Sequence, residues 1–299
     1  MEKKALVAII AISSIIVLTL FFTILRSYNG GVSSKKGKIM TDSSSIFSKD
    51  EVAVIEIKGV ISDSDETLEK IRQISERDIV KAVVVRIDSP GGGVAPSQEI
   101  YEELKKLDAK KPVIASLGTL AASGGYYIAI GARSIVSNPG TLTGSIGVIM
   151  QLADLQKLYE FIKISPITIK SGKFKDIGST SRNMTAEERD LLQKLSDDIH
   201  MQFKKDVSKA RNIPMPELEK IADGRILSGL QAKDVKLVDE LGNFQDAVDL
   251  ATTVAKIKGK PTLYYPEAKK DGFMKFLMGT KSLVEKIITE AQVSAPLVM

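Results

Sequence analysis

Apolar strands and amphipathic helices alternate along the middle of this 299-residue chain, and this alternation restricts the possible folds more than any other feature. The apolar runs "VAVIEIKGVI" (52–61), "AVVVRID" (82–88) and "PVIASL" (112–117) predict strands. Helical spacing of apolar residues predicts helices over 65–76 and 96–107. Strands joined by crossover helices run parallel, so the pattern predicts an α/β fold.

The pattern continues beyond residue 120. A short helix is expected after Ser123, and further strands near 134–137, 145–150 and 166–170. The capping box "TAEE" (185–188) predicts the start of a long helix over 185–211, and Pro214 the start of a short one.

The two ends of the chain differ from this body. Residues 5–25 contain no charge and would span about 31 Å as a helix, which predicts a transmembrane anchor. A cleaved signal peptide is disfavoured because "ILRSYNG" offers no small-x-small cleavage site. The predicted organisation is an anchor (1–26), a flexible Ser/Gly/Lys-rich linker (27–50), a folded domain (51–265) and an amphipathic C-terminal segment (266–299).

Composition excludes several classes of function. The chain has no cysteine and one histidine, which excludes disulfides, thiolate nucleophiles and Cys- or His-rich metal sites, and we expect no cofactor. Residues 1–50 hold seven Lys and Arg against three Asp and Glu, whereas the rest of the chain holds 35 against 34. The basic charge therefore flanks the predicted anchor, and we expect no nucleic-acid partner.

Ser123 stands out in "TLAASGGYYIAIGARSI" (119–135) because its neighbours have almost no side chain. One interpretation is a tight turn packed against a sheet. The other is a nucleophile on a sharp strand-to-helix turn, where small neighbours admit a substrate and the N–H of Gly124 faces the oxyanion. The stretch "IDSPGGGV" (87–94) also ends a strand in glycines, and it lacks the spacing of a phosphate loop.

A nucleophilic serine needs a base. His200 lies well inside the predicted long helix, where a surface role is more common. Lysine can replace histidine when its pKa is depressed. Lys170, Lys173 and Lys175 are the candidates in "TIKSGKFKDIGSTSRNM", and spacing does not choose among them.

Five motifs in colinear order resemble the short bacterial signal peptide peptidase A family: "DSPGGG", "AASGGYYIA", "NPGTLTGSIGV", "SGKFKDIGS" and "IADGRILSGLQAKDVKLVDELG". The resemblance covers about residues 50–255. It implies a membrane-anchored peptidase with a Ser/Lys dyad on the Clp-protease/crotonase-type β-α-β spiral fold. Its implied substrates are cleaved signal peptides and other unfolded apolar peptides; a related protease acting on a membrane-protein partner is the alternative.

The resemblance also implies roles for individual residues. Ser123 corresponds to the nucleophile, Lys175 to the general base, and Ser145 to a hydroxyl that hydrogen-bonds the lysine amine. Gly124 and Gly92 correspond to the oxyanion donors. The family further implies a homo-oligomer, a dome-like ring such as an octamer, with catalytic groups shared between neighbours.

The family implies a single-pass protein of the cell (inner) membrane with its catalytic domain on the extracytoplasmic side. The charges around the anchor favour the opposite orientation weakly, because Arg26, Lys35, Lys36 and Lys38 follow it while Lys3 and Lys4 precede it. We follow the family in expecting the extracytoplasmic side.

Overall fold

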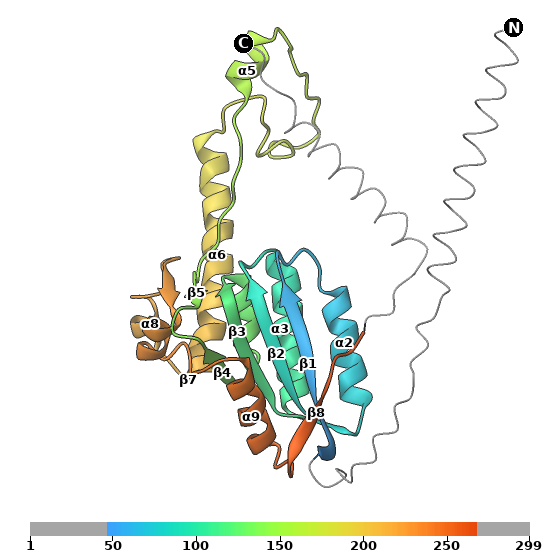
Figure 1. Ribbon diagram of the computed structural model, residues 1–299. Helices are drawn as coiled ribbons and strands as arrows, with labels where there is room; N and C mark the ends of the chain where they lie inside the picture. Colours follow the sequence, from blue (N-terminus) through green and yellow to red (C-terminus); the bar gives the residue numbers. More distant parts are fainter. Residues whose placement is uncertain (1–46, 268–299) are drawn as a thin grey trace, which may run out of the picture. The chain divides into compact units, whose positions relative to one another are not determined.

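Three buried parallel strands form the centre of the structure, a computed structural model that describes residues 47–267 (Figure 1). They are β1 (Phe47–Lys58), β2 (Val80–Ser89) and β3 (Val113–Ala122), joined by the crossover helices α2 (Asp65–Glu76) and α3 (Val94–Asp108). The predicted α/β class is therefore confirmed, with a sheet whose described pairs are parallel except for one.

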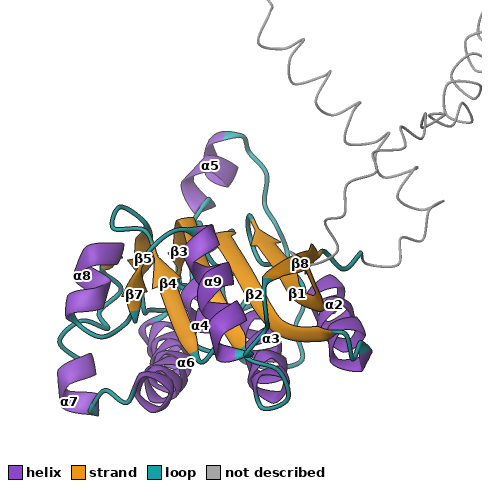
Figure 2. Cartoon of the chain, turned by 60° about the horizontal axis from the view of Figure 1, so that its bottom comes forward, coloured by secondary structure: helices purple, strands orange, loops and turns teal. Residues whose placement is uncertain are grey.

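Helices cover both faces of this sheet (Figure 2). Alternate residues of β1 and β2, such as Ile55 and Val85, belong to the core shared with α2 and α3. The residues between them, such as Val52 and Val84, pack with α9 (Phe244–Val254) on the opposite face. Burial on both faces explains why these strands are continuous apolar runs rather than alternating ones.

Strand β3 is the branch point of the sheet. Its first half pairs with β4 (Ser134–Ser137), and its last residues, from Leu120 to Ala122, pair with β5 (Leu142–Gly144). Three strands extend the sheet at its edges: β6 (Ile226–Ser228), β7 (Glu240–Leu241) and β8 (Lys260–Tyr264). The short helices α7 (Met215–Leu218) and α8 (Gly229–Asp234) lie between α6 and β7 in the chain. Because the last residues of β3 pair with β5, the ends of these two strands meet beside the short helix α4 (Gly124–Ala129).

An arm projects from the sheet, formed by residues 148–196 (Figure 1). It contains an extended segment, α5 (Gln156–Phe161), a loop over 162–185 and the first part of α6 (Ala186–Arg211). The predicted long helix and its capping box are confirmed, since Thr185 and Glu188 cap α6 reciprocally.

The strands predicted at 145–150 and 166–170 are wrong. Ser145 has a φ of 50°, which ends β5, and the chain after it runs into the arm without a strand partner among the described residues. Residues 166–170 lie exposed in the arm loop, also without a strand partner there. Both runs have strand-like composition, but a strand needs a neighbour to satisfy its backbone.

The predicted anchor (5–25) and most of the C-terminal segment (266–299) lie outside the described residues. Within residues 47–267 no helix combines the length and apolar character needed to cross a bilayer. Strand β1 begins at Phe47, so its first residues fall inside the range predicted as linker.

Candidate active site

Ser123 occupies a sharp turn between β3 and α4, as the small neighbouring residues predicted. Its φ of 53° and ψ of −121° lie outside the regions that non-glycine residues normally adopt. Such a conformation costs of order 1–3 kcal/mol and persists only where the surroundings enforce it. Here the Ser123 N–H donates to the Gly144 carbonyl (2.9 Å), and the Ser123 carbonyl accepts from the Tyr127 N–H (2.8 Å).

Glycines are required around Ser123 because another loop packs directly on the turn. A β-carbon on Gly91 would lie 2.6 Å from the Gly124 nitrogen and 3.0 Å from the Ser123 β-carbon. A β-carbon on Gly124 would lie 2.5 Å from the Ser97 hydroxyl. The glycine loop after β2 and the Ser123 turn therefore touch backbone to backbone.

Two backbone N–H groups lie next to the serine. Ile61 donates to the Gly91 carbonyl (3.0 Å) and accepts from the Gly93 N–H (2.7 Å), so the N–H of Gly92 between them faces away from Ile61. The Gly92 nitrogen lies 3.3 Å from the position of a β-carbon on Gly124. Gly124 begins α4, so its N–H has no acceptor within the helix. Within residues 47–267 neither N–H has a hydrogen-bond acceptor, an arrangement suited to holding an oxyanion.

Ser145 is the neighbour of Ser123 across the sheet. Ala122 pairs with Gly144, so the two serines follow paired residues of parallel strands, whose backbones lie about 4.8 Å apart. The Ser145 N–H donates to the Arg225 carbonyl (2.8 Å), which holds the residue at its positive φ. His200 contacts the next residue through its Nε2 atom, 3.0 Å from the Ile146 carbonyl, and so supports the loop after Ser145.

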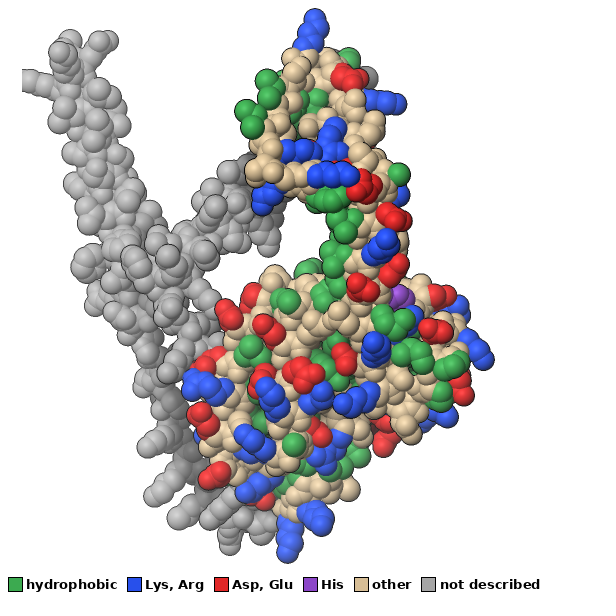
Figure 3. Space-filling model, turned by 180° about the vertical axis from the view of Figure 1, so that it is seen from behind, with side chains coloured by type: hydrophobic (Ala, Val, Ile, Leu, Met, Phe, Trp, Pro, Cys, Tyr) green, Lys and Arg blue, Asp and Glu red, His purple; other side chains and the backbone are tan. Residues whose placement is uncertain are grey.

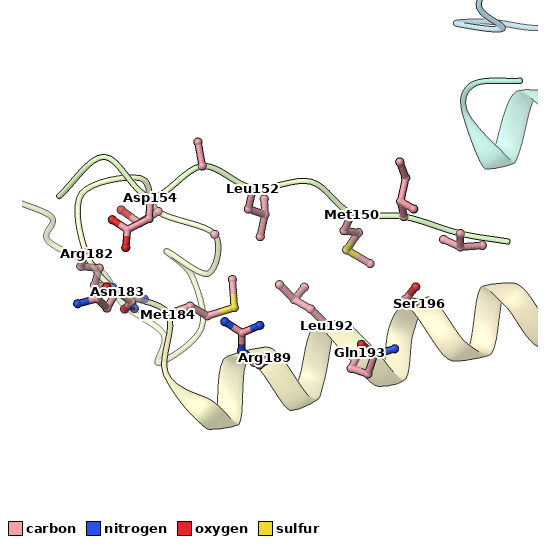
Figure 4. A pocket seen from close by; sticks show the side chains of 15 residues that line it. Met150, Leu152, Asp154, Arg182, Asn183, Met184, Arg189, Leu192, Gln193 and Ser196 are labelled. Carbon is pink, nitrogen blue, oxygen red and sulfur yellow. Dashed lines mark hydrogen bonds between the residues drawn. The ribbon is translucent and has the colours of Figure 1, made fainter. Parts of the chain in front are cut away.

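A small apolar cavity of about 30 Å³ opens beside Ser123. Its apolar walls are Val94, Tyr127, Val148, Ile199 and Phe203. Val148 also lines a groove of about 500 Å³ that runs along the arm between the extended segment and α6 (Figure 4). In that groove Met150 and Leu152 face Leu192, and polar side chains such as Arg182 and Asp154 lie toward the tip of the arm.

The three candidate lysines lie together in the arm loop but have different surroundings. The Lys170 ammonium pairs with the Asp176 carboxylate (2.5 Å), and Lys173 pairs with Glu187. Lys175 is exposed, and within the described residues its amine has no hydrogen-bond or ion-pair partner. Among the three, Lys175 is the one without a carboxylate partner in the part of the chain that the structure describes.

Arg182 fixes the position of this loop. It donates to the Asp176 carboxylate (2.9 Å) and, through both terminal nitrogens, to Glu188 (2.5 and 2.9 Å). The hydrogen bonds from Arg182, followed by that from Lys170, hold the pKa of the Asp176 carboxyl well below its usual range. Hydrogen bonds from Arg182 and then from Thr185 lower the pKa of Glu188 to about 2.

The structure brings Ser123, Ser145, Gly124 and Gly92 together but leaves Lys175 apart from them. The Lys175 loop is tied to Glu188 at the start of α6, whereas the cavity beside Ser123 is lined by Ile199 and Phe203 of the same helix. At 1.5 Å per residue, Glu188 lies about 17–22 Å along α6 from Ile199 and Phe203. In this structure Lys175 therefore lies apart from the serine of its own chain.

Sequence reasoning missed two contributions to the site. Ile199 and Phe203 lie four residues apart on one face of α6, a spacing that the sequence displays. Arg182 gives no such signal, because its two carboxylate partners come from a turn and a helix start that no local pattern connects.

Comparison with known proteins identifies the family. Residues 105–258 match the model of peptidase family S49. A Synechocystis protein named as a candidate protease is 44% identical over 207 residues, covering 69% of this chain and 74% of that protein. The chloroplastic serine protease SPPA of Arabidopsis thaliana is 36% identical over 223 residues, covering 70% of this chain and 33% of that protein.

Protease 4 of Salmonella typhi is 34% identical over 259 residues, covering 83% of this chain. The matched region spans only 42% of that protein's length, and a third of the Arabidopsis protein. The family match over residues 105–258 includes the turn at Ser123 and the arm. The chain therefore belongs to peptidase family S49 and is a serine peptidase.

Proposed function

We propose that Ser123 is the nucleophile and Lys175 the general base of a Ser/Lys peptidase. The observation that carries this proposal is the strained turn that presents Ser123 beside the two acceptor-free N–H groups of Gly92 and Gly124. In the first step neutral Lys175 accepts the hydroxyl proton while the Ser123 oxygen attacks the peptide carbonyl. The two N–H groups stabilise the oxyanion.

The remaining steps follow from the same groups. Lys175 returns its proton to the departing amine, and the peptide C–N bond breaks to leave an acyl ester on Ser123. A water molecule then gives a proton to Lys175 and attacks the ester carbonyl. The ester C–O bond breaks, the carboxylic acid of the cleaved peptide leaves, and Lys175 returns the proton to the Ser123 oxygen. Ser145, beside Ser123, is suited to hydrogen-bond the lysine amine and orient its lone pair.

We further propose that Lys175 comes from a neighbouring copy of the chain in a ring-shaped homo-oligomer. Two observations support this. Lys175 lies well away from Ser123 in its own chain, and the arm that carries it exposes large apolar side chains, as Figure 3 illustrates. Phe161, Ile167 and Ile169 are each more than four-fifths exposed. A single chain gains nothing from such exposure, whereas an interface would bury it.

The proposed substrates are cleaved signal peptides and other unfolded apolar peptides. The cavity beside Ser123 is small and its walls are apolar, which favours small or apolar residues next to the cleaved bond. The groove along the arm, whose walls are both polar and apolar, shares Val148 with that cavity and could hold more of an extended peptide. Folded proteins do not present an extended strand to a recessed serine.

The membrane setting also belongs to the proposal. Residues 5–25 would anchor the chain in the cell membrane with the catalytic domain on the extracytoplasmic side, close to released signal peptides. We also propose that the parallel sheet around β3 is a version of the Clp-protease/crotonase-type spiral.

Mixing two inactive variants tests the proposal. Ser123→Ala keeps the lysine and Lys175→Ala keeps the serine, and each homogeneous protein should be inactive on a synthetic apolar signal peptide. Co-expressed in equal amounts, they should recover about a quarter of wild-type activity, because a head-to-tail ring pairs an intact serine with an intact lysine at that frequency. His200→Ala should retain most of the activity, because His200 contacts the Ile146 carbonyl and none of the proposed catalytic groups.

No recovery in a co-assembled mixture would place both groups in one chain and refute the shared site. Activity in Lys175→Ala alone would refute the dyad. Mass spectrometry follows the cleavage of the signal peptide and of a folded control protein. Equal rates for the two would refute the proposed substrate class.

A further inference from the structure

The residue after Lys175 is an acid, and this poses a chemical problem for the proposed dyad. A carboxylate next to a lysine favours the charged ammonium and raises the lysine pKa. A general base must be neutral before it accepts a proton. Asp176 is in position to oppose the function of Lys175 unless its carboxylate is engaged elsewhere.

The structure shows where that carboxylate is engaged. One Asp176 oxygen accepts from Arg182 (2.9 Å) and the other from Lys170 (2.5 Å). Arg182 also reaches the Asp176 backbone carbonyl (3.4 Å), so the guanidinium holds both the side chain and the main chain of this residue. Both carboxylate oxygens are thereby directed to cations other than Lys175.

Arg182 is itself anchored to a rigid element. It forms a two-pronged ion pair with Glu188, whose side chain is 4% exposed. Glu188 also accepts from the Thr185 N–H (2.9 Å) in the capping box of α6. The chain of contacts from Asp176 through Arg182 to Glu188 therefore connects the Lys175 loop to the start of a 26-residue helix.

We propose that Arg182 is a positioning residue for Lys175: it withholds the Asp176 carboxylate from the lysine amine and fixes the loop on α6. This inference rests on the proposed Ser/Lys dyad. It explains why a lysine surrounded by other charges has no ion-pair partner among the described residues while Lys170 and Lys173 do.

The charged groups around Lys175 define the expected electrostatics. The loop contributes Lys170, Lys173, Asp176 and Arg182, and α6 contributes Glu187 and Glu188. The segment leading into α5 and α5 itself add Asp154, Lys157 and Glu160, which line a separate hollow with Asn183. Removing Arg182 shifts this balance toward negative charge, and removing Asp176 shifts it toward positive charge.

The test is the pH profile of kcat/KM for the full-length chain in detergent, with an apolar signal peptide as substrate. In Arg182→Gln the rising limb should move to higher pH by about one unit, so that activity falls about tenfold on the acid side and largely recovers at high pH. Asp176→Asn should move the limb to lower pH. The double variant should lie between the two single variants.

Controls separate this proposal from a loss of fold and from failure of the dyad. Arg72→Gln removes an exposed, ion-paired arginine on α2 and should leave the profile unchanged. Lys175→Ala should be inactive at every pH; activity there would refute the dyad itself. A uniform loss of rate in Arg182→Gln with an unmoved limb, or an unmoved limb in Asp176→Asn, would overturn the role of Arg182. If Arg182→Gln fails to fold, the Asp176→Asn profile alone decides.

Discussion

At the scale of single residues, the site depends on backbone positions that only certain side chains tolerate. Ser123 holds an unfavourable φ and ψ because its N–H and carbonyl are both engaged, and Gly91 has a φ of +99° against the same turn. Ser123 lines the cavity at the end of β3. Substitutions at Ser123 and Gly91 should therefore change the stability and the activity of the protein to different degrees.

The backbone strain at Ser123 leads to a stability prediction. Ser123→Gly and Ser123→Ala should both abolish peptide hydrolysis, because both remove the hydroxyl. Glycine adopts a positive φ without steric cost, whereas alanine keeps the strain, so Ser123→Gly should be the more stable by about 1 kcal/mol. Chemical denaturation of the two inactive proteins measures the difference. Greater stability of the alanine variant would contradict the strain argument.

The close packing of the glycine loop predicts a second effect. Gly91→Ala would place a methyl group 2.6 Å from the Gly124 nitrogen at a positive φ, so the loop must move away from the serine. We expect kcat to fall by about 100-fold, the scale seen when an oxyanion donor is lost. Gly140→Ala is a matched control, because no atom lies within 4 Å of its added carbon. Equal activity of both variants would show that the loop is not tightly constrained.

At the scale of elements, α6 joins the two parts of the proposed mechanism. Its first turn holds the Lys175 loop through Glu188 and Arg182, and its middle lines the cavity beside Ser123 with Ile199 and Phe203. His200, on the same stretch, contacts the loop after Ser145. A substitution at the start of α6 should therefore alter the position of the Lys175 loop more than the surroundings of Ser123.

The low pKa of Glu188 predicts how stability depends on pH. Its folded pKa of about 2 lies below the ordinary value of 4.5, so the carboxylate stabilises the folded state above pH 4.5 and this contribution disappears as the pH falls toward 2. In Glu188→Gln the free energy of unfolding should fall less between pH 6 and pH 3 than it does in the wild type. Thr185→Ala should lower stability by about 1 kcal/mol at neutral pH while retaining most of the pH dependence. An unchanged slope in Glu188→Gln would contradict this assignment.

At the scale of the whole molecule, the elements that could be predicted from the sequence are those that a pattern of neighbouring residues specifies. The apolar runs of β1, β2 and β3 and the capping box of α6 carry their own pattern, and each lies where expected. The segments 145–150 and 166–170 have the same apolar character but no strand to pair with in residues 47–267. Whether an apolar run becomes a strand depends on distant neighbours, which local pattern does not contain.

The same limit applies to the site. Ser123 and Gly124 are adjacent in sequence, and the turn that they form was predictable from their residue types. Among Lys170, Lys173 and Lys175, residue types left the choice open, and Lys175 was chosen by the family resemblance. The pairing of Lys170 with Asp176 and of Lys173 with Glu187 depends on the folded loop, which no local pattern contains. The distance between Lys175 and Ser123 is likewise a property of the arm as a folded unit.

The exposed arm leads to a prediction about assembly. If a second copy supplies Lys175, a charge placed on the apolar surface of the arm should weaken association and activity together. Phe161, at the end of α5, is 84% exposed, so Phe161→Asp should leave the fold of the single chain intact. Tyr265→Asp is the control, since Tyr265 is half exposed and follows β8 at the opposite edge of the sheet.

Dissociated chains would keep Ser123, Ser145 and both N–H groups but lack the base, and removing one member of such a unit typically costs orders of magnitude in rate. We therefore expect the activity of Phe161→Asp to fall by at least 100-fold at low protein concentration and to rise more steeply than linearly with concentration, since association follows mass action. Analytical ultracentrifugation on the same samples measures the assembly. Full activity from a chain that sediments as a monomer would show that Lys175 reaches Ser123 by bending of its own arm.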